Sequence, residues 1–294
     1  MTQMPTGQIP GFYHRRIGDI AVTAVSDGYL DGDMGVLRGI GPDDAHAILA
    51  ANFRPVPGRR TSVNCFIVRS GGKTALIDTG SGDYMMPTAG RLQANLAAAG
   101  VDPAAVDAVI LTHMHPDHSA GLTDMKTGKA FFPNAELVFH ENEHRHWFDD
   151  AAMAKADERT RKLNFQQARE QSEPYRDRWR MFRDGEVFPG VTAIPAPGHT
   201  PGHTTYLLAS GDQQLLIWGD TVHVPEVQTA RPEVTVAYDI DPASAEASRR
   251  RVFDRVATDR LLVTGMHLHF PGFNHLKRSG DGYALVPEAW SQTM

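Results

Sequence analysis

The 294-residue chain carries a formal net charge of −6, with 29 Lys and Arg against 35 Asp and Glu. Hydrophobic residues make up 41% of it and charged residues 22%, which is ordinary for a globular protein that buries a substantial core. The acidic balance argues against a nucleic-acid partner, which would require a basic surface. No run approaches the roughly 18 apolar residues of a membrane-spanning helix, so no membrane association is expected either.

Cysteine usage restricts the chemistry further. Cys65 is the only cysteine, which excludes an intrachain disulfide and a multi-cysteine zinc site. A transition metal would therefore have to be held by histidine and carboxylate. Residues 1–16 lack a basic start followed by an apolar run, so no signal peptide is expected and the predicted compartment is the cytoplasm. The periplasm would follow only if an export segment had been removed.

The first half of the chain begins with residues 1–60, which are rich in Gly and Pro and are predicted to form an irregular arm with a strand near 20–26. Two short strands, 62–68 and 74–80, are predicted to form a hairpin about Gly71-Gly72. A helical pattern lies within 87–99 and ends at Gly100. Two more strands are predicted, at 106–112 and 135–140.

The second half opens with the highly charged segment 141–183, which is predicted to be a helical insertion of one or two amphipathic helices. Asp241-Pro242 has the pattern of a helix cap and first helical residue, and that helix should reach about Ala257. The strands predicted for this half are 190–196, 204–210, 213–220 and 260–266, with a turn at 211–212 between the second and third.

Each half therefore starts with consecutive strands and continues with helices. This order favours two stacked sheets with helices outside over one doubly wound parallel sheet. We expect a single α/β domain over 1–294, built as a sandwich.

Histidines and aspartates gather where the predicted strands end. The densest group lies in "LTHMHPDHSAGL", and the others lie in "PAPGHTPGH", "LLIWGD" and "LLVTGMHLHFPG". The candidate ligands are His113, His115, Asp117, His118, His199, Asp220 and either His267 or His269. This set is larger than one tetrahedral zinc requires, so two metal ions are the economical explanation. Imidazole with carboxylate suits Zn, Mn, Fe or Co, and the ligand types do not choose among them.

Each candidate also has a structural interpretation. The dense histidine group would be an unusual coincidence as a plain polar loop, whereas Asp220 after Gly219 has the pattern of a turn residue. His267 and His269 compete for the last position, and spacing cannot separate them. His203 and His223 follow other candidates closely, so a supporting role behind the metal ligands is expected for both.

The ligand set also predicts a reaction. Two metal ions roughly 3.5–4 Å apart share a water and lower its pKa towards neutrality. The resulting bridging hydroxide would attack a carbonyl or phosphoryl centre while a metal takes up the developing negative charge. Asp117 and Asp220 are the nearest candidates to protonate the leaving alkoxide.

The motifs "THMHPDH", "PAPGHTPGH" and "IWGD" with a late histidine resemble the metallo-β-lactamase superfamily. The tail "GMHLHFPGFNHL" resembles the branch that contains methyl parathion hydrolase, dihydrocoumarin hydrolase and N-acyl-homoserine lactonases. The resemblance implies a four-layer αβ/βα sandwich with a dinuclear metal site, most often zinc, and a homodimer. It also implies that His267, a few residues before the Phe-Pro-Gly turn, is the last ligand rather than His269.

Carried over residue by residue, the resemblance assigns His113, His115 and His199 to the first metal. It assigns the second metal to Asp117, His118 and His267, with Asp220 bridging the two. Trp147 matches an aromatic position of the branch and joins Tyr84, Met85 and Met86 as an expected part of the substrate pocket.

The leading functional hypothesis is a hydrolase that opens lactones or cleaves related esters. Residues 84–87 (YMMP) depart from the aromatic residue that often follows the "DTG" loop in the branch, and flexible methionines suit an acyl chain. A phosphotriester or phosphodiester hydrolase on the same site is the alternative. A non-catalytic ligand-binding protein is a third, although an intact ligand set argues against it.

Overall fold

The computed structural model describes residue 4 and residues 6–293, and it contains two seven-stranded mixed sheets. The first sheet has the strand order β1 (Phe12–Ile17), β2 (Ile20–Gly32), β4 (Arg59–Ser70), β5 (Lys73–Ile77), β6 (Ala108–Ile110), β9 (Glu136–His140) and β10 (Trp179–Phe182). The second has the order β11 (Gly185–Phe188), β12 (Val191–Pro195), β13 (Thr204–Ser210), β14 (Gln213–Ile217), β16 (Leu262–Thr264), β17 (Asn274–Ser279) and β18 (Gly282–Pro287). Each half of the chain thus supplies one sheet.

Two of the predicted hairpins form as expected. Strands β4 and β5 pair up to Ser70 opposite Lys73, around Gly71-Gly72. Both glycines have positive φ angles, 58° and 74°, which a two-residue hairpin turn requires and which side chains disfavour. Strands β13 and β14 close in the same way at residues 211–212, with Ser210 opposite Gln213.

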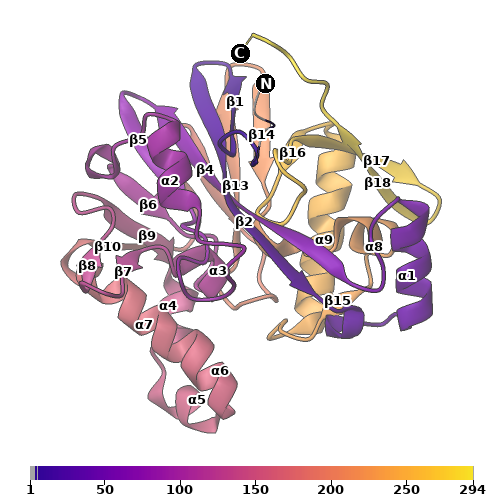
Figure 1. The fold of residues 1–294 in the computed structure, drawn as a ribbon, viewed down its shortest axis with the longest axis horizontal. Helices are drawn as coiled ribbons and strands as arrows, with labels where there is room; N and C mark the ends of the chain where they lie inside the picture. The colour runs from indigo at the N-terminus through magenta and orange to yellow at the C-terminus, as the bar shows by residue number, and fades with distance from the viewer. Residues whose placement is uncertain (1–3, 5, 294) are drawn as a thin grey trace.

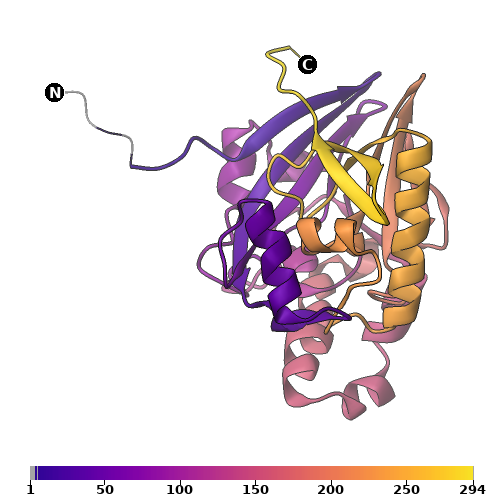
Figure 2. The ribbon, with the colours of Figure 1, turned by 90° about the vertical axis from the view of Figure 1, so that its right-hand side faces the viewer.

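The two sheets face each other across the main apolar core, to which Phe66 and Ile77 contribute from the first sheet and Leu208 and Leu215 from the second. The outer face of each sheet is covered by helices. Helix α2 (Leu92–Ala98) packs Leu96 on the first sheet, and α9 (Pro242–Thr258) packs on the second. Figures 1 and 2 show these helices on opposite outer sides, which gives the predicted four-layer sandwich.

Shorter elements complete the chain. They are η1 (Met34–Val36), β3 (Leu37–Arg38), α1 (Pro42–Ala51), η2 (Pro103–Ala105), α3 (Pro116–Ser119), β7 (Thr123–Asp124), β8 (Lys129–Ala130), η5 (Gly219–Thr221), α8 (Pro225–Ala230) and β15 (Thr235–Val236). Among the described residues, no helix is both long and apolar enough to span a membrane.

The structure differs from the sequence prediction in the segment 1–60. Apart from residues 1–3 and 5, which lie outside the described part, this segment is largely regular rather than an irregular arm. It supplies β1, β2 and α1. Several of its glycines lie at positions with positive φ within and between these elements. Gly28, with φ 119°, forms a bulge that interrupts the pairing of β2 with β4. This glycine therefore marks a bend within a long strand and does not show that the strand is missing.

The segment 141–183 also differs in detail. It contains several short helices and ends in the sheet strand β10, instead of one or two amphipathic helices. These helices are α4 (Glu141–Trp147), α5 (Asp150–Lys155), α6 (Glu158–Thr160), η3 (Arg161–Gln166), α7 (Gln167–Ser172) and η4 (Glu173–Arg178). Separate caps start several of them: Asp149 and Asp157 each accept a backbone hydrogen bond at the start of a new helix. Figure 1 shows α5 and α6 projecting beyond the sandwich.

Candidate metal centre

Three imidazoles form a first group of converging nitrogens: those of His113, His115 and His199. Nε2 of His113 lies 3.1 Å from Nδ1 of His115, which in turn lies 2.9 Å from Nε2 of His199. The first two residues follow β6, and His199 lies in the loop between β12 and β13. All three rings are buried, with 6% exposure at most. This group, called the first group below, can hold one metal ion.

A second group consists of Asp117, His118, Asp220 and His267. Nε2 of His118 lies 3.2 Å from Oδ1 of Asp220 and 3.6 Å from Oδ1 of Asp117. Nε2 of His267 lies 3.4 Å from Oδ2 of Asp117. The second group can hold another metal ion and lies directly beside the first.

Asp220 lies between the two groups. Its Oδ2 is 3.3 Å from Nε2 of His199 and 3.7 Å from Nε2 of His113, in the first group. Its Oδ1 is 3.2 Å from both His118 and His267, in the second. The two oxygens of a single carboxylate therefore reach the ligand nitrogens of both groups.

Hydrogen bonds on the far side of the rings orient three of these histidines. Nδ1 of His118 donates to Asp78 over 2.7 Å, and Nδ1 of His199 donates to Asp239 over 2.8 Å. Nδ1 of His267 donates to the backbone oxygen of Ser62 over 2.8 Å. Because these oxygens only accept, each Nδ1 carries a proton, and each Nε2 is the nitrogen that would face a bound ion.

The donor set fits a metal centre because its inward atoms lack other partners. Nε2 of His118 and Oδ1 of Asp220 are buried and have no hydrogen bond within the described residues. Buried polar atoms without a partner are costly, and lone pairs facing one another at about 3 Å repel. A cation held by these atoms would remove both costs.

Burial and the neighbouring carboxylates shift the pKa values of the buried rings in opposite directions. Burial lowers the pKa of His113 and of His115 well below the ordinary value, so both stay neutral. Burial also lowers the pKa of His203 to about 3. At three other ligand rings burial also lowers the pKa, but the neighbouring carboxylates outweigh it: the pKa of His118 is raised well above its ordinary value, and those of His199 and His267 are raised to about 9. A metal-binding imidazole must be neutral, so an ion would displace a proton from these three rings.

Glycines with positive φ place two of these side chains. Gly198, with φ 132°, lies so close to α9 that a Cβ atom would be 2.0 Å from the backbone nitrogen of Ala245. Gly219, with φ 56°, lies against the ring of His203, where a Cβ atom would be 2.5 Å from Nε2. The neighbours of these glycines are His199 and Asp220, so both ligand positions depend on turns that only glycine fits.

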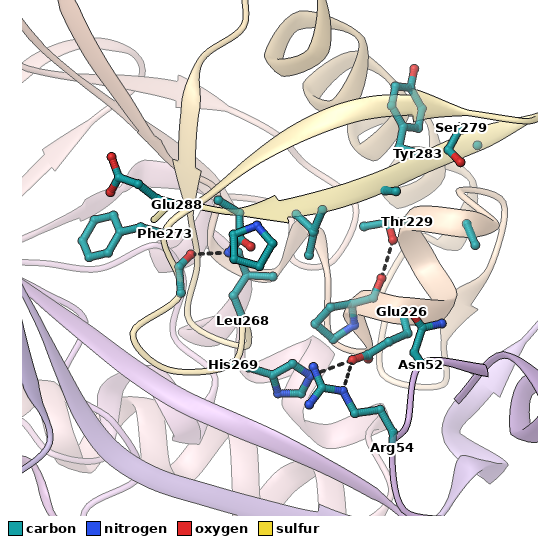
Figure 3. Close-up of a pocket in the computed structure, with 18 of the residues that line it drawn as sticks. Asn52, Arg54, Glu226, Thr229, Leu268, His269, Phe273, Ser279, Tyr283 and Glu288 are labelled. Atoms are coloured by element: carbon teal, nitrogen blue, oxygen red, sulfur yellow. Dashed lines mark hydrogen bonds and ion pairs between the residues drawn. The ribbon is translucent and has the colours of Figure 1, made fainter. Parts of the chain in front are cut away.

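The two candidates for the last ligand lie in different places. His267 belongs to the second group, whereas Nε2 of His269 is 2.8 Å from Oε1 of Glu226. Figure 3 shows this pair with Arg54 at the edge of a neighbouring cavity of about 770 Å³. The geometry therefore brings His267, and not His269, to the other ligand candidates.

His203 and His223, expected behind the ligands, have different positions. Nδ1 of His203 donates to the backbone oxygen of Ala196, and its Nε2 accepts the backbone N–H of Asp220 over 2.8 Å. His223 reaches further in, with Nε2 3.0 Å from Oδ2 of Asp220, and it forms a third potential metal group with His199 and Asp220. Its spacing from Asp220 in "GDTVH" was the only sequence signal for a direct contact.

A cavity of about 460 Å³ opens over the second group. Met85 and Met86, each 42% exposed, line it together with Leu163 and Tyr238, as predicted for the two methionines. Asp117 also borders the cavity, and its side chain is 16% exposed against 2% for Asp220.

The other two residues expected in the pocket lie elsewhere. Tyr84 lines a neighbouring cavity, and its hydroxyl donates to the backbone oxygen of Lys162 over 3.1 Å. Trp147 is 1% exposed and packs beneath His115, with its indole N–H bound to Glu143. Of the four side chains predicted for the substrate pocket, only the two methionines therefore line the cavity of about 460 Å³.

Comparison with known proteins places this arrangement in a family. Residues 58–267 match the family described as the metallo-beta-lactamase superfamily. The structure of a protein described as hydrolase AbOPH in the beta lactamase superfamily superposes with a TM-score of 0.92, at 31% sequence identity, over 97% of this chain and 100% of that one. The chain therefore belongs to the metallo-β-lactamase superfamily.

Two further relatives are lactonases. AidC, described as a dizinc quorum-quenching lactonase in complex with its product, superposes with a TM-score of 0.87 at 25% identity over 96% of this chain and 99% of AidC. The N-acyl homoserine lactonase AttM of Azorhizobium caulinodans is 29% identical over 120 residues, 39% of this chain and 40% of AttM. The chain thus aligns with 40% of the length of this curated relative.

Proposed function

We propose that this protein is a dinuclear metal-dependent hydrolase that opens lactones or cleaves related carboxylic esters. The observation that carries the proposal is the position of Asp220, whose two carboxylate oxygens face two adjacent groups of converging ligand atoms. The similarity to AidC and to AttM, both described as lactonases, supports the lactone as substrate class.

The first group, His113, His115 and His199, would hold one ion. Asp117, His118 and His267 would hold the other, and Asp220 would contact both. The description of AidC as a dizinc protein supports zinc, with Mn, Fe or Co as alternatives that the same donors accept. When bound, two such ions lower the pKa of a water so that a hydroxide is available near neutral pH, and they stabilise negative charge on the substrate oxygen.

The residues of this chain would bind the substrate and transfer a proton to its leaving group. Met85, Met86 and Leu163 line the cavity with adaptable apolar surface, which suits a flexible acyl chain. Arg59 borders the same cavity, where its Nε donates to the backbone oxygen of Asp33 and its Nη1 to the Thr61 hydroxyl, so that Nη2 would be the nitrogen to approach a carbonyl oxygen of the acyl group. Asp117, the more exposed of the two carboxylates, would take up the proton of the attacking oxygen and hand it to the leaving ring oxygen.

The test combines metal analysis with a substrate panel. Elemental analysis of purified protein should give close to two transition-metal ions per chain, and γ- and δ-lactones should be hydrolysed faster than aryl esters, phosphotriesters or phosphodiesters. One ion or none, with no gain of activity on adding Zn²⁺ or Mn²⁺, would exclude the dinuclear site. If two ions are found and phosphoesters are the preferred substrates, the dinuclear site stands and the protein is a phosphoester hydrolase instead of a lactonase. Two ions with no turnover of any panel member would favour the non-catalytic ligand-binding protein.

A further inference from the structure

Glu143 is a fully buried carboxylate that lies outside the two metal groups. It belongs to α4, and its side chain accepts four hydrogen bonds. Oε2 accepts the backbone N–H of Met114 over 2.8 Å and the indole N–H of Trp147 over 2.7 Å. Oε1 accepts the hydroxyl of Thr200 over 2.5 Å and the backbone N–H of Gly202 over 2.8 Å. Each oxygen therefore receives two donors.

No described cation forms an ion pair with Glu143, so these four donors alone offset the desolvation of the carboxylate. Burial raises the pKa of Glu143, while the hydrogen bonds lower it. A glutamine of the same shape has one oxygen, and its amide nitrogen would face two donors instead of accepting from them. The four-donor arrangement is therefore specific for a carboxylate.

Three of the four donors come from the two loops that carry the first metal group, and the fourth, Trp147, belongs to α4 itself. Met114 lies between His113 and His115 in the chain, and Thr200 follows His199 directly. One oxygen of Glu143 thus binds the loop after β6, and the other binds the loop between β12 and β13. The approach is close, because a Cβ atom on Gly202 would lie 2.7 Å from the backbone nitrogen of Glu143.

We propose that Glu143 is a positioning residue that sets the spacing of the first metal group. By binding both loops, it holds Nδ1 of His115 within 2.9 Å of Nε2 of His199. The inference rests on the two-ion part of the proposed function, and it concerns only one of the two ions.

The second group has its own buried carboxylate, which makes the two sites separable. Asp78 binds Nδ1 of His118 and the backbone N–H of Thr112, each over 2.7 Å. Asp78 also accepts the hydroxyl of Thr112 over 2.7 Å, and that hydroxyl lies 3.1 Å from Nδ1 of His113, so Asp78 reaches one ligand of the first group as well. Glu143 has no hydrogen bond to a ligand of the second group. Substitution of Glu143 should therefore weaken the first site alone, whereas Asp78→Asn should weaken mainly the second.

The test measures Zn²⁺ affinity by competition with a chromophoric chelator, without any substrate. The wild type should bind two equivalents, whereas Glu143→Gln should bind one with wild-type affinity and the other about 10–100-fold more weakly. In a His267→Ala background, in which only the first group is complete, Glu143→Gln should reduce the affinity of the remaining ion by the same factor.

Tyr175→Phe is the matched control. It also removes a buried hydrogen-bonding group, since the Tyr175 hydroxyl donates to the backbone oxygen of Leu122, at the end of the loop after β6, and accepts the N–H of Phe132, but it contacts no residue adjacent to a metal ligand. It should lower the melting temperature and leave both Zn²⁺ affinities unchanged.

The outcomes separate this inference from the proposed function. A folded Glu143→Gln variant that binds two ions as tightly as the wild type would overturn the role of Glu143. A wild type that binds fewer than two ions would overturn the dinuclear site itself. If Glu143→Gln does not fold, Thr200→Val removes one donor to Oε1 and should still weaken one ion; unchanged affinity for both ions would overturn the inference.

Discussion

The carboxylate of Asp27 accepts the backbone N–H of Ser81 over 2.8 Å, and this contact holds one end of the loop that lines the candidate pocket. The same side chain accepts the N–H groups of Gly90 and Leu92 at the other end of the loop. Met85 and Met86 lie between these anchor points. One buried acid therefore holds both ends of the segment that would face the substrate.

Asp27 gives a prediction for the pH dependence of stability. Burial raises its pKa from 3.8 to about 6, with the backbone hydrogen bonds opposing the shift. The folded state therefore binds this proton more tightly than the unfolded state, and the contribution of Asp27 to stability falls as the pH rises from about 4 to 6. The full loss is on the order of 3 kcal/mol.

Chemical denaturation of the wild type and of Asp27→Asn, both treated with chelator, isolates this effect. The variant lacks the titrating group, so the wild type should lose stability relative to Asp27→Asn as the pH rises through that window. A difference between the two proteins that is constant from pH 4 to 7 would contradict the raised pKa.

The last ligand is tested by a pair of alanine variants. His267→Ala removes a nitrogen that lies 3.2 Å from Asp220, so about one of the two ions and most of the activity should be lost. His269→Ala removes only a contact with Glu226 and should retain both ions. Metal content after dialysis decides the question, and loss of an ion from the His269 variant alone would reverse the assignment.

Asp220 is expected to be indispensable for every substrate of the site. Asp220→Asn keeps the shape of the side chain and removes the negative charge shared between the two groups. Hydrolysis of lactones and of phosphotriesters should fall together, each by more than about a hundredfold, because both would depend on the same two ions. Steady-state kinetics with both substrates provide the measurement, and a selective loss of one activity would point to separate machinery.

The substrate preference itself can be given a magnitude. A lactone carbonyl needs one polarising contact and one proton for the ring oxygen, whereas a phosphotriester must fit three substituents around phosphorus. We expect kcat/KM for a γ- or δ-lactone to exceed that for a paraoxon-type triester by at least about a hundredfold, roughly 2.7 kcal/mol. Equal efficiencies with the same metal-loaded preparation would contradict the lactonase proposal.

Met85 and Met86 should control the selectivity of the enzyme for the length of the acyl chain. Replacing both Met85 and Met86 by serine removes apolar contact with an acyl chain, at about 0.8 kcal/mol for each buried methylene. kcat/KM for a long-chain acyl lactone should fall about tenfold, while that for an unsubstituted lactone should change little. Tyr84→Phe, on the same loop but facing a neighbouring cavity, serves as the control. An equal loss for both substrates would show that the two methionines do not contact the acyl chain.

The sandwich and the ligand candidates were predictable because both depend on local patterns. Strand hairpins such as that at Gly71-Gly72 are marked by their turn residues, and ligand histidines follow apolar strand runs. Strand β1 was missed and β2 was predicted only over 20–26, because a glycine at a bulge and a glycine in an irregular loop look alike in sequence.

The supporting residues were much harder to predict. Glu143 lies in a charged segment that has the composition of a solvent-exposed helix, yet three of its four donors belong to two remote loops, and two of these three are backbone N–H groups. Backbone donors leave no residue pattern, so no spacing signals the contact. The position of Trp147 could not be predicted for a related reason, since only the packing of α4 shows that its ring lies below His115 and not in the cavity.

Each metal group combines side chains from both halves of the chain. His113 and His115 come from the half that forms the first sheet, and their partner His199 comes from the other. The second group is divided in the same way, with Asp117 and His118 on one side and Asp220 and His267 on the other. Ions bound there would act as cross-links between the two sheets. A chain with Cys65 as its only cysteine cannot form an intrachain disulfide for the same purpose. The same ions would then govern both chemistry and the cohesion of the halves, so that a chelator would loosen the sandwich as it abolished turnover.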